Sequence, residues 1–449
     1  MHMRVIRTAF QVTVLGAAFM ILLAVNAGAM IDGISGTTFN LAAKTGHVST
    51  PDGGSYLLWG YANGAGMGMA QYPGPTLIVN QGATVQVKLT NSLTVAGGGA
   101  PPNVSIVFPG QRVTVLPSDP GVPGVLTNEA APGKTVTYQF KADNPGTYTY
   151  YSGTDSALQV EMGLFGAIIV RPSTGANYAY NHQDTQFDRE NLFLLSEMDP
   201  RIHQVVENFG PAGVAGTDYL ANYFPVLWFI NGRAAPDTMS EPMAPWLPYQ
   251  PYNCMPMMHP GEKLLMRVIG GGRDLHPFHH HGNHARVIAR DGRLLESAPN
   301  SGPDLSYEVF TIQSHPGSTI DAIFEWTGKG LGWDIYGTTA AGPEFAHDCM
   351  DMDGDDFDDM THEYCPDHNK PFPVVLPPTQ ELTLGGFYSG SPYLGLVSSL
   401  PPGEGGLNPN GGYVFMWHSH TEKEMVNFDI FPGGMMTMLI IEAPGVMIH

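Results

Sequence analysis

The sequence predicts an all-β protein made of two related β-sandwiches, and three observations lead to this fold class. Gly and Pro contribute 55 and 38 of the 449 residues, which disfavours a mainly helical fold because both residues break helix interiors. Short runs of alternating or β-branched residues, such as 85–89 and 167–170, lie between these breakers and are typical of sandwich strands. A series of such runs then occurs twice along the chain.

The internal repeat predicts where the two sandwiches lie. In chain order, residues 74–80, 82–87, 132–136 and 148–170 are echoed by residues 224–232, 261–268, 316–320 and 415–441. We therefore expect one sandwich over residues 31–175 and a second sandwich over residues 190–445.

The second copy of the repeat is longer than the first. Tyr151 lies 19 positions after Pro132, whereas the matching His418 lies 102 positions after Pro316. The difference predicts a long insertion at about residues 328–412, a segment rich in Gly, Pro and Asp.

The charge balance excludes some classes of partner. The chain has 20 Lys and Arg residues against 41 Asp and Glu residues, so its formal net charge is −21. Such an acidic chain is repelled by nucleic acid and by anionic membrane surfaces, and it attracts cations. We expect no nucleic-acid partner.

The first 29 residues resemble a secretory signal peptide. Arg4 and Arg7 precede a mostly apolar run over residues 9–25, and Ala27-Gly28-Ala29 has the small-residue pattern of a cleavage site. An uncleaved membrane anchor is the alternative, since the apolar run is only slightly shorter than a membrane-spanning helix. We favour cleavage of residues 1–29, which predicts a periplasmic or extracellular protein with no stable membrane insertion afterwards.

Three cysteines give this exported chain one expected disulfide. Cys349 and Cys365 flank a short polar loop and are expected to pair, since disulfides persist outside the cytosol. Cys254 is then left over, either as a free thiol or as a metal ligand.

Two histidine motifs are the strongest functional signal. Residues 276–284 contain His276, His279 and His281, and residues 418–420 contain His418 and His420. Residues i and i+2 of a β-strand point to the same side, so each H-x-H pair can direct two imidazoles to one point. Neighbouring strands would place four imidazoles together, which suits Cu, Zn, Ni or Fe. The alternative is a set of hydrogen-bonded histidines without metal.

Two further segments carry metal-ligand residue types. Cys254, Met257, Met258 and His259 together offer soft donors that suit Cu(I), although Met also fills gaps in cores. Asp351, Asp353 and Asp355 alternate around Gly354, as in loops that wrap calcium, but without the complete spacing of an EF-hand. A solvated acidic loop is the alternative there. A copper-collecting loop is a third interpretation, based on His347, Met350, Met360, His362 and His368.

Several motifs are similar to those of the multicopper oxidase family. The segments are 72–77 (YPGPTL), 162–166 (MGLFG), 276–282 (HPFHHHG, like the family's H-P-x-H-L-H-G) and 418–420 (HSH, at its H-C-H). The resemblance covers nearly all of the chain after residue 29. It implies two cupredoxin-like Greek-key sandwiches in a two-domain layout like that of copper nitrite reductases. It also implies copper as cofactor and a homo-oligomer, a trimer in two-domain members.

The chain departs from the family's blue-copper ligands. His276 matches the first histidine, but Ser419, Glu424 and Asp429 stand where the family has Cys, His and Met. A hydroxyl is a poor substitute for a thiolate, so the resemblance implies that no blue copper is bound.

The ligands of the family's trinuclear cluster are only half present. The repeat places Val107, Pro109, Tyr151 and Gly153 opposite His279, His281, His418 and His420, and His47 is the only histidine in residues 30–175. The remaining histidines, all in the second sandwich, are enough for one mononuclear site or two close ones.

Three functions are compatible with these residues. The first is an exported copper-dependent oxidoreductase with fewer coppers than its relatives. The second is a copper-handling protein without catalysis, and the third is a structural or interaction scaffold that has lost the chemistry. We place copper binding first, with oxidoreductase activity open, and the scaffold third.

Overall fold

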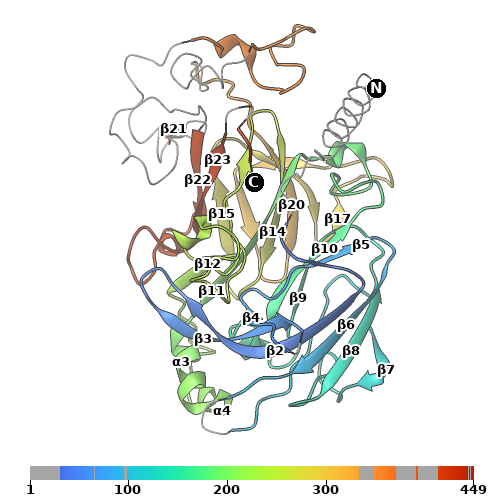
Figure 1. Ribbon diagram of the computed structural model, residues 1–449, viewed down its shortest axis with the longest axis vertical. Helices are drawn as coiled ribbons and strands as arrows, with labels where there is room; N and C mark the ends of the chain where they lie inside the picture. The colour runs from blue at the N-terminus through green and yellow to red at the C-terminus, as the bar shows by residue number, and fades with distance from the viewer. Residues whose placement is uncertain are drawn as a thin grey trace, which may run out of the picture.

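A computed structural model describes residues 31–449, apart from residues 65, 96–98, 333–347, 371–390, 393–412, 443, 445 and 449. The predicted signal peptide at residues 1–29 lies outside the described residues, as does most of the predicted insertion. The structure is all-β and consists of two β-sandwiches, which lie one above the other along the long axis of the molecule (Figure 1).

Within the part of the chain that the structure describes, the first sandwich has a six-stranded and a four-stranded sheet. The larger sheet has the order β4 (Ala70–Gln71), β3 (Ser55–Asn63), β2 (Thr38–Ser49), β6 (Thr84–Asn91), β8 (Thr135–Lys141) and β7 (Thr114–Pro120). The smaller sheet has the order β1 (Ile34–Ser35), β5 (Leu77–Asn80), β10 (Phe165–Arg171) and β9 (Gly146–Tyr151).

The described strands of the second sandwich form a seven-stranded and a six-stranded sheet. The first has the order β12 (Leu227–Ile230), β11 (Arg189–Met198), β14 (Lys263–Gly270), β20 (Thr319–Glu325), β16 (Ala285–Arg290) and β17 (Arg293–Leu294), with β18 (Tyr307–Val309) paired to β16. The second has the order β13 (Met257–Met258), β23 (Met436–Ile441), β22 (Tyr413–Ser419), β15 (His276–His280) and β19 (Thr311–Ser314), with β21 (Ser391–Pro392) paired to β22.

The strands form where apolar residues alternate, because alternate side chains then face the core between the sheets. In β6, Val85, Val87 and Leu89 are fully buried, and each pairs with a buried residue of β8. Burial of apolar area of this kind is the main term that stabilises each sandwich.

The internal repeat corresponds to a repeated topology, with one correction. β6 and β14 are matched, as are β8 with β20 and the β9–β10 pair with the β22–β23 pair. The expected match of residues 74–80 with residues 224–232 is wrong. β5 pairs in parallel with β10, and the strand that pairs in parallel with β23 is β13 rather than β12. The two apolar runs look alike, but an apolar run does not specify its partner strand.

The helices in the part of the chain that the structure describes are short. They are α2 (Ser156–Gln159), α3 (Pro200–Phe209), α4 (Pro211–Val214) and the 3₁₀ turns η2 (Gln183–Thr185), η3 (Asp237–Met239), η4 (Cys365–Asp367) and η6 (Glu422–Met425). α3 begins where Pro200 follows Asp199, whose carboxylate accepts a hydrogen bond from the Arg201 backbone N–H. In the described residues we find no helix with the length and apolar character needed to cross a membrane.

The two sandwiches share a buried interface. Apolar residues of both, including Tyr72 and Phe165 from the first and Phe229 from the second, form one cluster in which Tyr72 contacts both phenylalanine rings edge-on. Beside it, the Glu190 carboxylate binds Arg171 of the first sandwich and Arg267 of the second. Apolar packing and a buried ion network therefore both hold the sandwiches together.

Candidate metal centre

Pairing of β15 with β22 brings the two histidine motifs together. The strands are antiparallel, and His279 lies directly opposite His418. His281, just after β15, lies two residues beyond His279 and therefore points to the same side. His279, His281 and His418 thus lie on one face of the sheet.

The imidazole rings lie close enough to share one ion. Ring nitrogens of His279, His281 and His418 are all within 4.8 Å of one another. The ring centroids of His279 lie 4.8 Å from His281, 5.4 Å from His418 and 4.9 Å from His420. His420 is more exposed than the other three and lies at the edge of the group. His279, His281, His418 and His420 together form a group that we call the imidazole centre.

The electrostatics of the centre favour neutral rings. Burial lowers the pKa of His279 to about 4 and that of His281 to about 3, and the neighbouring imidazoles add to both shifts. Burial also lowers the pKa of His418. Since a metal binds the neutral imidazole, these rings do not need to lose a proton near pH 7 before they bind.

Hydrogen bonds to neighbouring residues hold the residues of the imidazole centre in position. His279 Nδ1 lies 2.9 Å from the Thr311 hydroxyl, and His418 Nδ1 lies 2.8 Å from the Ser419 carbonyl oxygen. The Trp417 indole N–H donates to the His281 carbonyl oxygen at 2.9 Å. Partners of this kind fix ring orientation in metal sites.

His276 does not join the imidazole centre, which differs from the expected five-histidine set. It lies three residues before His279, an odd spacing that turns its side chain to the opposite face of the strand. There, Nε2 lies 2.8 Å from Glu197 and Nδ1 lies 2.9 Å from Glu424. Both ring nitrogens are thus held by carboxylates.

Three of the four positions that match the family's blue-copper ligands, namely His276, Ser419 and Glu424, form a buried hydrogen-bond network. The Ser419 hydroxyl donates to Glu424 at 2.5 Å, and Glu424 also contacts His276. Burial alone would lower the pKa of His276, but its hydrogen bonds to Glu197 and Glu424 outweigh burial and raise the pKa to about 9. Asp429, at the methionine position, is exposed. Both nitrogens of the His276 ring are therefore engaged by carboxylates in this network.

The first sandwich repeats the strand pairing without the ligands. Val107 pairs with Tyr151 as His279 pairs with His418, so the alignment of the repeat at these positions agrees with the structure. Val107 and Tyr151 replace two imidazoles, and the described part of this sandwich offers no matching donor set.

The donor side chains of the segment that contains Cys254 do not point toward one common position. Cys254 is buried in the core of the second sandwich, where burial raises the pKa of its thiol. Met258 points into this core, and its strand neighbour Met257 points outward. His259 uses Nδ1 toward Glu262 at 3.1 Å and Nε2 toward the Val446 carbonyl oxygen at 2.7 Å.

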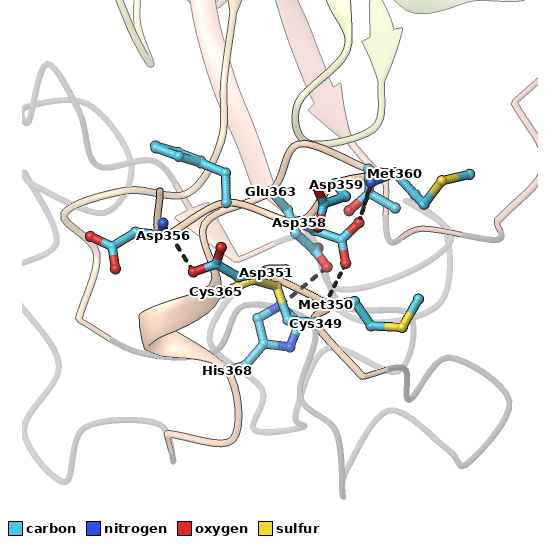
Figure 2. The surroundings of a disulfide bond; sticks show 12 residues. Cys349, Met350, Asp351, Asp356, Asp358, Asp359, Met360, Glu363, Cys365 and His368 are labelled. Atoms are coloured by element: carbon cyan, nitrogen blue, oxygen red, sulfur yellow. Dashed lines mark hydrogen bonds and ion pairs between the residues drawn. A yellow bond between two sulfur atoms is a disulfide. The ribbon is translucent and has the colours of Figure 1, made fainter. Parts of the chain in front are cut away.

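The longest described part of the insertion, residues 348–370, is a loop with a disulfide. Cys349 and Cys365 are bonded, and Figure 2 shows the His368 imidazole beside the bond. His368 Nε2 lies 3.3 Å from the buried carboxylate of Glu363. His347, from the copper-collecting interpretation, lies outside the described residues.

The acidic loop brings its three alternating carboxylates together. Oxygens of Asp351, Asp353 and Asp355 lie within 4.8 Å of one another. Asp351 accepts hydrogen bonds from the backbone N–H groups of Gly354 and Asp356, and Asp356 is labelled beside it in Figure 2. The charge of Asp355 raises the pKa of Asp353, which shows the mutual repulsion of the carboxylates.

Thr311 and Glu197 were missed by the sequence interpretation. Thr311 comes from β19, which pairs with β15 on the side away from β22. Glu197 lies in β11, 79 residues before His276. A charged residue inside the apolar run 192–198 was the available signal for a buried partner of opposite charge.

Comparison with known proteins supports the resemblance. The profile of the family described as multicopper oxidase matches residues 60–175. An L-ascorbate oxidase from Nicotiana tabacum is 34% identical over 162 residues, which cover 34% of this chain and 25% of that protein. The chain therefore spans about a quarter of the length of that curated relative.

Two solved structures share the fold over most of their length. The blue copper oxidase from Nitrosomonas europaea matches with a TM-score of 0.52 and 18% identity, over 90% of this chain and 85% of that chain. The multicopper oxidase mgLAC matches with a TM-score of 0.53 and 18% identity, over 92% and 87%. The match to the multicopper oxidase profile thus lies in the first sandwich, and the likeness of fold to these two structures extends over both sandwiches.

Proposed function

We propose that this chain is an exported copper-binding protein whose copper site is the imidazole centre: His279, His281, His418 and His420. The observation that carries the proposal is the placement of three ring nitrogens within 4.8 Å of one another on one sheet face. The match of residues 60–175 to the multicopper oxidase profile supports copper as the ion, and the acidic chain favours the approach of cations.

The donor set fits copper. Neutral imidazole nitrogens are good ligands for copper, and the low pKa values of His279 and His281 keep both rings neutral. Bound copper would supply one-electron chemistry at this site. Thr311 and Trp417 orient the ring of His279 and the backbone of His281, and neither supplies a ligand atom.

Oxidoreductase activity is the first extension of the proposal. A substrate or reductant would reach the centre directly, since Ser419 and Glu424 occupy the ligand positions of the family's blue copper. Direct access is supported by the side chain of His420, which is 54% exposed, and by the exposed Phe310 ring, whose centroid lies 5.9 Å from that of His279. Absence of turnover with phenols, metal ions and nitrite would leave the second candidate, copper handling without catalysis.

Metal quantification with electron paramagnetic resonance tests copper binding. Copper-reconstituted protein should give an ordinary mononuclear signal without an intense thiolate-to-copper absorption band. H279A/H418A should lose this signal, whereas H47A, at a partly exposed histidine of the first sandwich, should retain it. Equal copper content in the wild type and in H279A/H418A would reject the site. If that variant also kept the physiological role, the scaffold function would be favoured.

Export and assembly are further parts of the proposal. The pattern in residues 1–29 supports a cleaved signal peptide, so the mature protein should begin near residue 30. N-terminal sequencing of protein from the host's extracytoplasmic fraction checks this. Family resemblance supports a homotrimer, which light scattering of the mature protein checks.

Calcium at the acidic loop is the last part of the proposal. It is supported by the grouping of the Asp351, Asp353 and Asp355 carboxylates, which are hard oxygen donors of the type that calcium prefers. Calcium titration of the metal-free protein should give a binding isotherm that D353N weakens. D304N, at an exposed aspartate outside the insertion, is the control. An isotherm unchanged by D353N would reject this assignment.

A further inference from the structure

A patch of methionines lies beside the imidazole centre on the same sheet. β22 and β23 are antiparallel, with His418 opposite Met436 and Met416 opposite Met438. Met416 lies two residues before His418, and Met438 lies two residues after Met436, so all four side chains point to one side of the sheet. The two adjacent cross-strand pairs therefore bring three thioethers and one imidazole together on this face.

The methionines contact one another. Met416 and Met436 pack with Ala235 in one small cluster, and Met438 packs against it. Met416 and Met436 are 8% and 5% exposed, whereas Met438 is partly exposed. The patch is thus shielded from water, with one thioether at its open edge.

The loop that contains Ala235 and Thr238 is held against this patch by hydrogen bonds to backbone carbonyl groups. The Ala235 N–H donates to the Gly434 carbonyl oxygen at 2.9 Å, and the Thr238 hydroxyl donates to the Met436 carbonyl oxygen at 2.8 Å. These bonds hold the segment with Ala235 against the methionines. The enclosure is therefore part of the fold and does not depend on a ligand.

The chemistry of the patch differs from that of the imidazole centre. Thioether sulfur is a soft, uncharged donor that selects Cu(I), whereas imidazole also serves Cu(II) and Zn. Directly opposite residues of an antiparallel pair have Cβ atoms about 4.5–5.5 Å apart, so flexible methionine side chains of two adjacent pairs can reach one ion. A monovalent ion also needs less charge compensation in a shielded site than a divalent ion does.

We propose that Met416, Met436 and Met438 form a second copper site, specific for Cu(I), adjacent to His418. Binding is simple coordination and needs no oxidant or reductant, because the ion arrives in the cuprous state. Met257 lies on the same sheet face one strand further out, opposite Ile440. The site is separate from the imidazole centre and does not require that the centre binds copper.

Ordinary packing is the competing explanation, because Met also fills gaps in cores. Substitution by leucine distinguishes copper binding from core packing, because a Met-to-Leu change approximately conserves side-chain volume and removes the sulfur. The triple variant M416L/M436L/M438L should therefore fold and unfold like the wild type. The matched control is M258L/M266L, at two methionines of the apolar core of the second sandwich.

The test is an anaerobic Cu(I) titration of the full chain against a chromophoric Cu(I) chelator, followed by X-ray absorption of the bound copper. The wild type and M258L/M266L should bind one Cu(I) with copper–sulfur scattering. M416L/M436L/M438L should lose that scattering and bind the ion about tenfold or more weakly. Unchanged affinity and scattering in this variant would overturn the proposal.

A second variant separates this proposal from that of the imidazole centre. H279A/H281A leaves His418 and the methionines in place, so it should keep the copper–sulfur scattering while it loses copper at the centre. Loss of the scattering in H279A/H281A would show that no separate thioether site exists. Copper–sulfur scattering in a wild-type protein whose imidazole centre binds no copper would support the thioether site and reject only the centre.

Discussion

At the scale of single residues, neighbouring histidines acquire opposite properties from their surroundings. Burial lowers the pKa of His279 to about 4, whereas two carboxylates raise that of His276 to about 9. The two residues are three positions apart and lie on opposite faces of β15. One face presents the imidazoles of the centre, and on the other face His276 lies between the carboxylates of Glu197 and Glu424.

The raised pKa of His276 predicts a pH dependence of stability. A group whose pKa is raised by folding contributes its full stability below its unfolded pKa of about 6.5 and loses it as pH rises through the folded value. The free energy of unfolding of metal-free protein should therefore decrease between about pH 6.5 and the folded pKa of about 9.

Denaturant unfolding at a series of pH values, with a chelator present, measures this decrease. The change in the free energy of unfolding across the window should be smaller in H276Q than in the wild type. H47Q, which alters a partly exposed histidine, should follow the wild type. Equal pH dependence in the wild type and H276Q would show that His276 is not protonated in the fold.

At the scale of elements, strand register assembles both candidate copper sites. The pairing of His279 with His418 joins the two histidine motifs, and the pairing of His418 with Met436 adds the methionines. A shift of one residue in either pair would turn one set of side chains into the core. β19 adds Thr311, which pairs with His279 from the other side.

Thr311 is expected to act as a positioning residue for His279, a ligand of the proposed copper site. T311V removes the hydroxyl 2.9 Å from His279 Nδ1 and should weaken copper binding by about 10–100-fold, the usual effect of losing such a partner. Competition with a copper chelator measures the affinity. T311S keeps the hydroxyl and should restore most of it, and a T311V affinity equal to that of the wild type would contradict the role.

At the scale of the whole molecule, the interface between the sandwiches contains a buried ion network. Burial disfavours the charge on Glu190, yet Arg267 and Arg171 outweigh this effect and hold the pKa of the carboxyl below its ordinary value. Arg267 and Glu190 are fully buried at their side chains, and Arg171 is nearly so. The network therefore couples the first sandwich to the paired strands β11 and β14 of the second.

Removal of the Glu190 charge should destabilise the molecule strongly. E190Q leaves two buried arginines without their shared carboxylate, and loss of one partner of a buried pair costs about 3–5 kcal/mol. Urea unfolding measures the cost. E325Q, which breaks the exposed pair Lys263–Glu325, is the control and should cost about 0–1 kcal/mol. If E190Q lowered the free energy of unfolding by as little as E325Q does, the interface would depend on apolar packing alone.

Much of the architecture could be predicted because it depends on local pattern. Alternation in residues such as Val85, Val87 and Leu89 indicates strands, and the repeat indicates two sandwiches. The partner of each strand was harder to predict. Residues 224–232 resemble β5, which pairs in parallel with β10, but they form β12, which pairs antiparallel with β11. Hydrophobic pattern specifies which face is buried and leaves the neighbouring strand open.

The amino-acid sequence by itself determined the strand faces of this protein, and with them the shared direction of His279 and His281 and of His418 and His420, because side-chain alternation is a property of each strand alone. Only the tertiary structure decided which strands are neighbours. It joined the two H-x-H pairs, placed Glu197 and Glu424 around His276, and set three methionines beside His418. These contacts depend on cross-strand register and on packing between sheets, which join residues far apart in the chain.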